Sequence, residues 1–200
     1  MSDQILWFAT RGAGVVSLIL LTMVTCLGLL TAVRWQSPSW PRFLTAGLHR
    51  NLALLSLAFL GTHIATAILD PFTSLGIAAA AIPFASSYRP FWVGLGVIAV
   101  DLVLALIVTS LIRERIGGRA WRAIHWASYA AWPLALVHGL GSGSDAFAPW
   151  LLAIQAICLA TVGAALLWRL SVGGSNRSRL PDVVAAGARR VPAPFAGRED

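Results

Sequence analysis

Long apolar runs alternate with short polar segments along most of this chain. Five of the runs match the roughly 20 helical residues that cross a bilayer, and they occupy residues 12–33, 43–69, 91–112, 120–140 and 149–168. Residues 71–90, between the second and third runs, are only moderately apolar and contain Pro83. We expect an interfacial loop with a short helical piece there. The pattern predicts an all-α integral membrane bundle of about five transmembrane helices.

The segments between the runs carry signals that end helices. Asp70 and Pro71 close the second run, because the residue before a proline avoids the helical conformation. Residues 35–41 hold two tryptophans and two prolines, which suits a loop at the headgroup level. RERIGGR, at residues 113–119, predicts a short basic loop. Residues 171–200 lack helical periodicity, which predicts a disordered cytoplasmic tail after a membrane domain at residues 1–170.

The composition is that of a membrane protein and not of a soluble domain. Hydrophobic residues make up 58% of the chain and charged residues only 12%, a balance outside the range of soluble domains. The net charge of +7 could suit a nucleic-acid binder. However, the basic residues, all of them arginine, mostly flank the apolar runs, where they act as topology signals. We therefore expect no nucleic-acid partner.

Two further features of the apolar runs bear on processing and on cysteine chemistry. No basic segment precedes the first run and no small-residue cleavage site follows it, so it predicts a retained helix and not a signal peptide. Cys26 and Cys158 lie inside apolar runs without C-x-x-C spacing. They are expected to be small packing residues and not a disulfide or a metal site.

The arginines predict how the chain is oriented. Most of those near the five spans fall on one side of the membrane: Arg34, Arg42, Arg50, Arg113, Arg115, Arg119, Arg122 and Arg169. Only Arg11 and Arg89 fall on the other side. The positive-inside rule then places the N-terminus outside the cell and the tail in the cytoplasm. We expect a multi-pass protein of the plasma membrane, and a bacterial one. The second and fourth helices are parallel in this arrangement.

The four histidines of the chain form two pairs of similar spacing. His49 and His63 are 14 residues apart in the second run, and His125 and His138 are 13 apart in the fourth. Either spacing corresponds to about 20 Å of helix rise. In parallel helices, His49 is level with His125 and His63 with His138. A lone histidine in an apolar helix usually serves packing, but ionisable residues in a membrane are costly, and four in this pattern favour ligands.

Pairs of facing neutral imidazoles suit a six-coordinate iron cofactor at each of two depths. Zinc prefers four ligands at one level, which histidines about 20 Å apart do not provide. A di-iron carboxylate centre needs clustered acids, and Asp101 is the only acid well inside a run. The C-x-x-C-H motif of covalent haem attachment is absent. The residues therefore predict two haem b groups with bis-histidine ligation, an arrangement for electron transfer.

Arginines near both predicted haem levels could pair with haem propionates. Arg50 and Arg122 neighbour His49 and His125 on the cytoplasmic side, and Arg11 and Arg89 are available on the other. Plain anchoring at the membrane interface is an equally good explanation for each of them.

The 13-residue spacing between His125 and His138 needs an explanation of its own. A spacing of 14 leaves two residues about 40° out of phase on an ideal helix, whereas 13 leaves about 140°. Pro133 lies between His125 and His138, so we expect a distorted helix around residues 129–137 that turns both imidazoles to one side.

Asp101, near the middle of the third run, is expected to be hydrogen-bonded to a serine or threonine, with a proton-relay role as the alternative.

At these histidines the sequence resembles the ferric reductase-like transmembrane domain family. The resemblance rests on a pair 14 apart on one helix, a pair 13 apart two helices later, and WRAIHWASY at residues 121–129 as a basic-aromatic lead into the inner ligand. It covers about residues 10–170. The family includes the haem-bearing membrane domains of ferric reductases and NADPH oxidases and the haem subunit that serves methionine sulfoxide reductase. It usually has six helices, one more than the pattern predicts here.

The resemblance implies transmembrane electron transfer from a cytoplasmic donor to ferric iron, oxygen or a redox protein outside. No G-x-G-x-x-G motif follows a predicted strand, so the chain is expected to need a separate flavoprotein or iron–sulfur reductase as donor. It would then be the haem subunit of an oxidoreductase. A quinone-coupled cytochrome b subunit of a respiratory complex is one alternative. A transporter or structural membrane protein with packing histidines is another, although no internal repeat supports transport.

Overall fold

The computed structural model describes residues 2–32 and 40–188, and the side chains within residues 4–32 and 40–171. Its helices are α1 (Ser2–Ala32), α2 (Arg42–Leu69), α3 (Ile77–Ala81), α4 (Pro90–Leu111), α5 (Arg113–His125), α6 (Ser128–Ser142) and α7 (Pro149–Ala188). The described residues contain no strand. The prediction of an all-α membrane helix bundle is confirmed.

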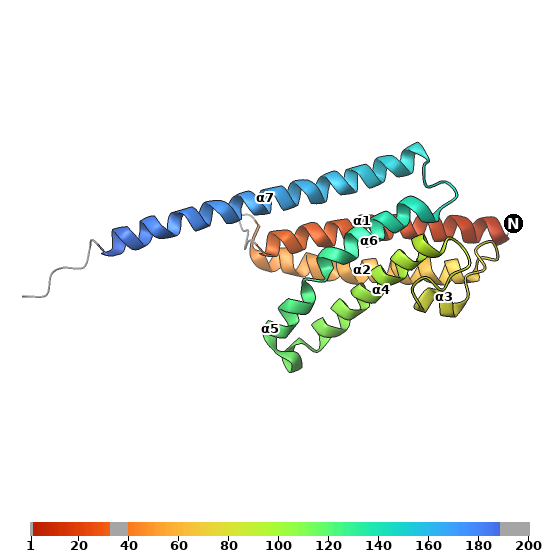
Figure 1. Cartoon of the computed structure of the whole chain (residues 1–200), viewed down its shortest axis with the longest axis horizontal. Helices are drawn as coiled ribbons and strands as arrows, with labels where there is room; N and C mark the ends of the chain where they lie inside the picture. The colour runs from red at the N-terminus through yellow and green to blue at the C-terminus, as the bar shows by residue number, and fades with distance from the viewer. Residues whose placement is uncertain (1, 33–39, 189–200) are drawn as a thin grey trace, which may run out of the picture.

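Four helices are long and apolar enough to span a membrane: Gln4–Ala32, Arg42–Leu69, Pro90–Leu111 and Pro149–Ser171. They correspond to four of the five predicted spans. The remaining span, expected as one helix over residues 120–140, is divided into α5 and α6, and Figure 1 shows the chain changing direction between them. The expectation of a single, distorted helix over residues 120–140 was wrong at this element.

The backbone hydrogen bonds show where the helix is interrupted between α5 and α6. The N–H of Ala127 donates to the carbonyl of Ile124 and that of Tyr129 to Trp126, which are the i→i−3 bonds of a tightened turn. Pro133 contributes no N–H, and its ring crowds the carbonyl of Tyr129 one turn upstream. The distortion expected at residues 129–137 was therefore not found, because α6 runs as one helix from Ser128 to Ser142 through Pro133. The interruption lies at Trp126 and Ala127 instead.

Three other element boundaries differ from the sequence prediction. α1 begins at Ser2, about three turns before the predicted start at Gly12. The predicted basic loop at 113–119 is helical, with a kink where Gly117 has a φ of 78°, a conformation open to glycine. α7 is helical through Ala188, past the predicted end at Trp168. The loop at 35–41 lies mostly outside the described residues. Of the tail predicted to be disordered, residues 171–188 are helical in α7, and residues 189–200 lie outside the described residues.

Two antiparallel pairs, α1 with α2 and α4 with α6, form the bundle, and α7 lies along α1 (Figure 1). α2 ends where predicted, with Asp70 as its C-cap. The short α3 confirms the helical piece expected between the second and third runs. This arrangement makes α2 and α6 parallel, as the pairing of histidines requires.

The buried core lies between α1, α6 and α7. Its members are Leu18, Trp132, Leu136, Cys158 and Val162, with Cys26 packed against them. The indole Nε1 of Trp132 donates to Thr22 Oγ1 at 2.9 Å, so the buried nitrogen is paired. Both cysteines are free. Their predicted role as packing residues is confirmed.

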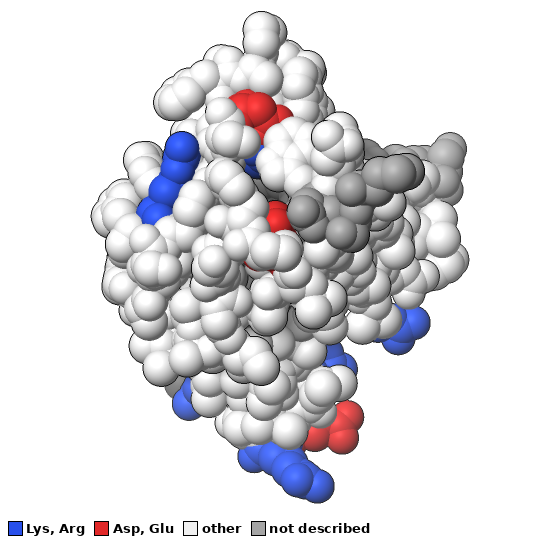
Figure 2. Space-filling view, turned by 90° about the vertical axis from the view of Figure 1, so that its right-hand side faces the viewer, with Lys and Arg blue, Asp and Glu red and all other residues white. Residues whose placement is uncertain are grey.

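Much of the outer surface is apolar, as a lipid-facing surface must be. Figure 2, which views the end of the bundle near α3, shows few charged side chains among a predominantly uncharged surface. Asp101 lies exposed on α4 and forms no hydrogen bond to a serine or threonine among the described side chains. The expected bond was therefore not found.

Candidate functional site

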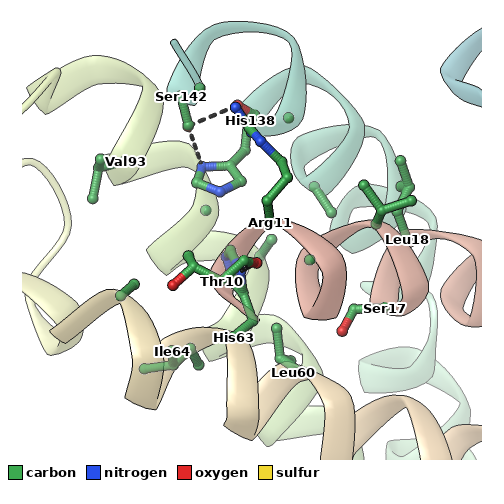
Figure 3. Close-up of a pocket in the computed structure, with 18 of the residues that line it drawn as sticks. Thr10, Arg11, Ser17, Leu18, Leu60, His63, Ile64, Val93, His138 and Ser142 are labelled. Carbon is green, nitrogen blue, oxygen red and sulfur yellow. Dashed lines mark hydrogen bonds between the residues drawn. The ribbon is translucent and has the colours of Figure 1, made fainter. Parts of the chain in front are cut away.

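His63 and His138 meet across a cavity between α2 and α6. Their ring centroids are 6.2 Å apart and the ring planes are nearly perpendicular, at 82°. Both side chains line a cavity of about 240 Å³ whose other walls are mostly apolar, including Leu60, Ile64 and Val97. Figure 3 shows the two histidines reaching into this space from different helices. The predicted pairing of these two residues is thus a feature of the fold.

The separation of these rings fits two axial ligands of one metal ion. Two metal–nitrogen bonds of about 2 Å each, with each ring centre beyond its nitrogen, put the centroids roughly 6 Å apart. Among the described residues no cluster of three or more His, Cys, Asp or Glu side chains could hold a metal ion by themselves. Two imidazoles facing an apolar cavity are a donor set that suits a planar iron cofactor. The residues present therefore fit haem b.

The two histidines of α2 are held by carbonyls of α1. His63 Nδ1 lies 2.9 Å from the carbonyl oxygen of Thr10, and His49 Nδ1 lies 3.1 Å from that of Val24. A carbonyl only accepts, so each Nδ1 carries the hydrogen and each Nε2 keeps its lone pair. Thr10 and Val24 are 14 residues apart, the same spacing as the histidines. The antiparallel pair α1–α2 therefore presents both imidazoles in the tautomer that binds a metal through Nε2.

His138 is held in the same way by α4, with one additional contact. Its Nδ1 lies 2.8 Å from the carbonyl oxygen of Trp92. Ser142 Oγ is 2.9 Å from the same nitrogen, while its hydroxyl donates to the carbonyl of His138. The dashed lines of Figure 3 mark these bonds of Ser142. The ring has two acceptors for one hydrogen, which fixes its orientation more firmly than a single acceptor would.

A glycine on the opposing helix lies against each of these three rings, and at two of them only a glycine leaves enough room. A Cβ placed on Gly14 would lie 2.9 Å from His63 Nδ1, and one on Gly96 would lie 2.5 Å from His138 Nδ1. At Gly28 the nearest atom, His49 Cε1, is 3.6 Å away, an ordinary contact distance. In each case the glycine follows the accepting carbonyl by four residues, one helical turn. Carbonyl and glycine together form a seat for the imidazole.

The second histidine level is built differently. His49, in the second turn of α2, and His125, at the end of α5, lie toward the same end of the bundle (Figure 1). His125, at the end of α5, is half-buried, and its Nδ1 is buried with no hydrogen-bond partner among the described residues. The ring of Trp121 lies against it instead, with centroids 4.8 Å apart. The structure therefore brings the predicted inner pair to the same end of the bundle, with the ring of His49 anchored to a carbonyl and that of His125 not.

The arginines expected near the haem levels have protein partners at one end of the bundle. Arg11 pairs with Asp145 in the α6–α7 loop. Arg89 donates to the carbonyls of Gly141 and, at 3.1 Å, of Gly143. The side chains of Arg50 and Arg122 are exposed at the other end. A role for any of the four toward a propionate stays a prediction.

Sequence reasoning missed the backbone part of the site. The carbonyls of Thr10, Val24 and Trp92 leave no trace in a sequence, because every residue has one. A usable signal was present in the glycines: Gly14 and Gly28 are 14 apart, as are His49 and His63. Matching spacings on consecutive helices of opposite direction indicate residues that face each other at two depths.

Comparison with known proteins agrees with this geometry. Residues 13–136, more than half of the chain, match the family described as ferric reductase like transmembrane component. The match includes His49, His63 and His125 and ends two residues before His138. No curated protein and no solved structure matches the chain significantly. By the extent of that match, and in keeping with its membrane helices, the chain belongs to the ferric reductase-like transmembrane family.

Proposed function

We propose that this protein carries electrons across a membrane by means of two haem b groups, one held by His63 and His138 and one by His49 and His125. The observation that supports it best is the His63–His138 pair, whose ring centroids lie 6.2 Å apart across an apolar cavity, so that the two imidazoles would hold one iron between them. Members of the family generally bind haem. When bound, haem supplies an iron that changes oxidation state without an open coordination position.

The residues of the chain prepare the site before any cofactor binds. The carbonyls of Thr10, Val24 and Trp92 hold hydrogen on Nδ1 of three histidines, which leaves Nε2 directed away from the opposing helix. The apolar walls exclude water, which favours electron transfer over side reactions. A set of ligands oriented in advance changes little between oxidation states, which is what rapid electron transfer needs.

Loss of one histidine level should remove one haem of two. In a His63→Ala, His138→Ala double variant we expect about half of the haem content, with the remaining haem still low-spin, because His49 and His125 are untouched. The reverse double variant, His49→Ala with His125→Ala, should keep the other haem. Absorption spectra of the oxidised and dithionite-reduced proteins, with haem quantified per chain, measure this directly.

The two double variants serve as controls for each other, since each removes two imidazoles from the bundle. Full haem content in either one would show that the pairing is wrong. A wild-type protein without haem would reject the proposal and leave a transporter or structural role to be tested. Reduction of the purified protein by a quinol would favour the quinone-coupled alternative.

The direction of transfer that we propose follows from the arginines. Arg113, Arg115, Arg119 and Arg122 are exposed around α5, at the His49–His125 end of the bundle. The positive-inside rule places such a surface in the cytoplasm. We propose that a separate flavoprotein or iron–sulfur reductase delivers electrons there, and that the acceptor at the His63–His138 end is ferric iron, oxygen or a redox protein. The same arginines also suit anionic lipid headgroups.

Charge reversal on this surface should slow electron delivery. For Arg115→Glu with Arg119→Glu, we expect reduction by a soluble NADH-dependent flavin reductase to slow by roughly tenfold at low salt, since opposite charges steer association. High salt should remove the difference. Sealed vesicles restrict the donor to one side of the membrane. Labelling of Arg119→Cys in a Cys26→Ala, Cys158→Ala background identifies which face of the protein is on that side. Equal rates from both sides would contradict the orientation, and an unchanged low-salt rate would place docking elsewhere.

A further inference from the structure

His125 differs from the other three histidines in what holds its ring. His49, His63 and His138 each donate from Nδ1 to a carbonyl on a neighbouring helix. The Nδ1 of His125 is buried and has no hydrogen-bond partner among the described side chains and backbone. A buried ring nitrogen without a partner costs free energy and leaves the ring free to rotate. Some other contact must therefore orient this imidazole.

The register of the helices explains why no carbonyl is available. His138 lies opposite Trp92 in the antiparallel pair α6–α4, so the same register carried to His125 would reach Ala105. The carbonyl of Ala105 instead accepts from Thr109 Oγ1 at 2.7 Å. The break between α5 and α6 at Trp126 takes His125 out of the register that α6 keeps. The interruption of the helix thus removes the fourth anchor.

Trp121, one helical turn before His125, occupies the place of that anchor. The indole and imidazole centroids are 4.8 Å apart with planes 31° from parallel, a tilted contact that is nearer to stacking than to an edge-on arrangement. The indole is itself fixed from the other side, because its Nε1 donates to Ser110 Oγ of α4 at 3.2 Å. A chain of contacts therefore runs from α4 through the indole to the imidazole.

We propose that Trp121 is the positioning residue for His125, and that it replaces by stacking the carbonyl anchor that the other three histidines have. The inference rests on the proposed function, since it concerns a ligand of the inner haem. The indole restricts rotation of the imidazole about its side-chain bonds, and Ser110 holds the indole. The inner ligand is therefore oriented by side chains that substitution can remove, whereas backbone carbonyls hold the others.

Substitution of Trp121 should affect the inner haem alone. In the His63→Ala, His138→Ala background, which keeps only the inner pair, we expect Trp121→Leu to lose more than half of the remaining haem or to make it bind carbon monoxide when reduced. Carbon monoxide needs an open coordination position, so it reports a detached ligand. With all four histidines present, Trp121→Leu should leave the haem held by His63 and His138 low-spin and unreactive toward carbon monoxide.

Conservative and neighbouring variants separate positioning from general packing. Trp121→Phe keeps an aromatic ring without the Nε1 donor and should restore most of the inner haem, while Ser110→Ala should give an intermediate loss. The matched control is Trp126→Leu, because Trp126 is 63% exposed and its ring packs on Tyr129. Two fully low-spin haems without carbon monoxide binding in Trp121→Leu would overturn the proposal.

A second measurement does not depend on haem. In protein prepared without haem, diethyl pyrocarbonate should modify His125 several-fold faster in Trp121→Leu than in the wild type, as followed by mass spectrometry of the peptide. Equal rates would reject the stacking role even if both haems bind. A wild-type protein that never binds haem but shows the expected protection would instead reject the proposed function and keep the contact.

Discussion

Replacement of Gly96 by alanine should remove the haem at the His63–His138 level. The added Cβ would lie 2.5 Å from His138 Nδ1 and 2.6 Å from Cε1, closer than atoms can approach. The ring must move off the carbonyl of Trp92, which holds it at 2.8 Å. Overpacking of this kind costs about 1–3 kcal/mol, which corresponds to roughly 5- to 150-fold weaker cofactor binding. Haem content and the spectrum of the reduced protein measure the loss.

The other two glycine seats provide a graded series. Gly28→Ala adds the same methyl group 3.6 Å from His49 and should keep both haems, while Gly14→Ala, at 2.9 Å from His63, should fall between. Alanine forms helix more readily than glycine, so a loss at Gly96 would not come from a weakened helix. Equal haem content in all three variants would show that the glycines do not seat the imidazoles.

The histidine pairing could be predicted from the sequence because it depends on two regular spacings. Fourteen residues on α2 and thirteen on the later segment return to similar depths whatever the details of the helices. Four of the five spans could be predicted for a related reason, since mean hydropathy responds to composition and length alone. Neither inference needed to know what the side chains contact.

The division into α5 and α6 could not be predicted in the same way. Apolarity continues through Trp126 and Ala127, so the mean hydropathy gives no sign of a boundary there. Pro133, the obvious helix-disturbing residue of this segment, lies inside α6, six residues after Ala127. The stacking of Trp121 on His125 depends on the resulting geometry. What the sequence offered was only a tryptophan four residues before a histidine, a spacing that places two side chains on one helix face.

Arg11 illustrates a contact that only the fold reveals. The sequence offered either a propionate or simple interfacial anchoring for it; in the structure it pairs with Asp145, which follows it by 134 residues. The pair ties the first helix to the α6–α7 loop, and Arg89 donates to the carbonyls of Gly141 and Gly143 in the same region. The wall of the cavity beside His138 therefore depends on charged side chains that come from three separate parts of the chain and meet at one end of the bundle.

Breaking this pair should destabilise the protein from either partner. The side chains are 18% and 24% exposed, between the surface and the buried case, so we expect Arg11→Met and Asp145→Asn each to cost about 1–3 kcal/mol of unfolding free energy. The double variant should cost little more than either single one, because both remove the same interaction. Reversible unfolding in mixed micelles measures the cycle.

The potential of the haem near His138 distinguishes the pair from a propionate contact. Loss of a nearby cation disfavours the reduced, more electron-rich state, so Arg11→Met should lower this potential. Asp145→Asn removes an anion and should raise it, and the double variant should return close to the wild type. Arg89→Met is the matched control, because Arg89 bonds carbonyls and has no carboxylate partner among its described contacts. If Arg11 serves a propionate instead, Asp145→Asn will leave stability unchanged while Arg11→Met alone lowers haem content.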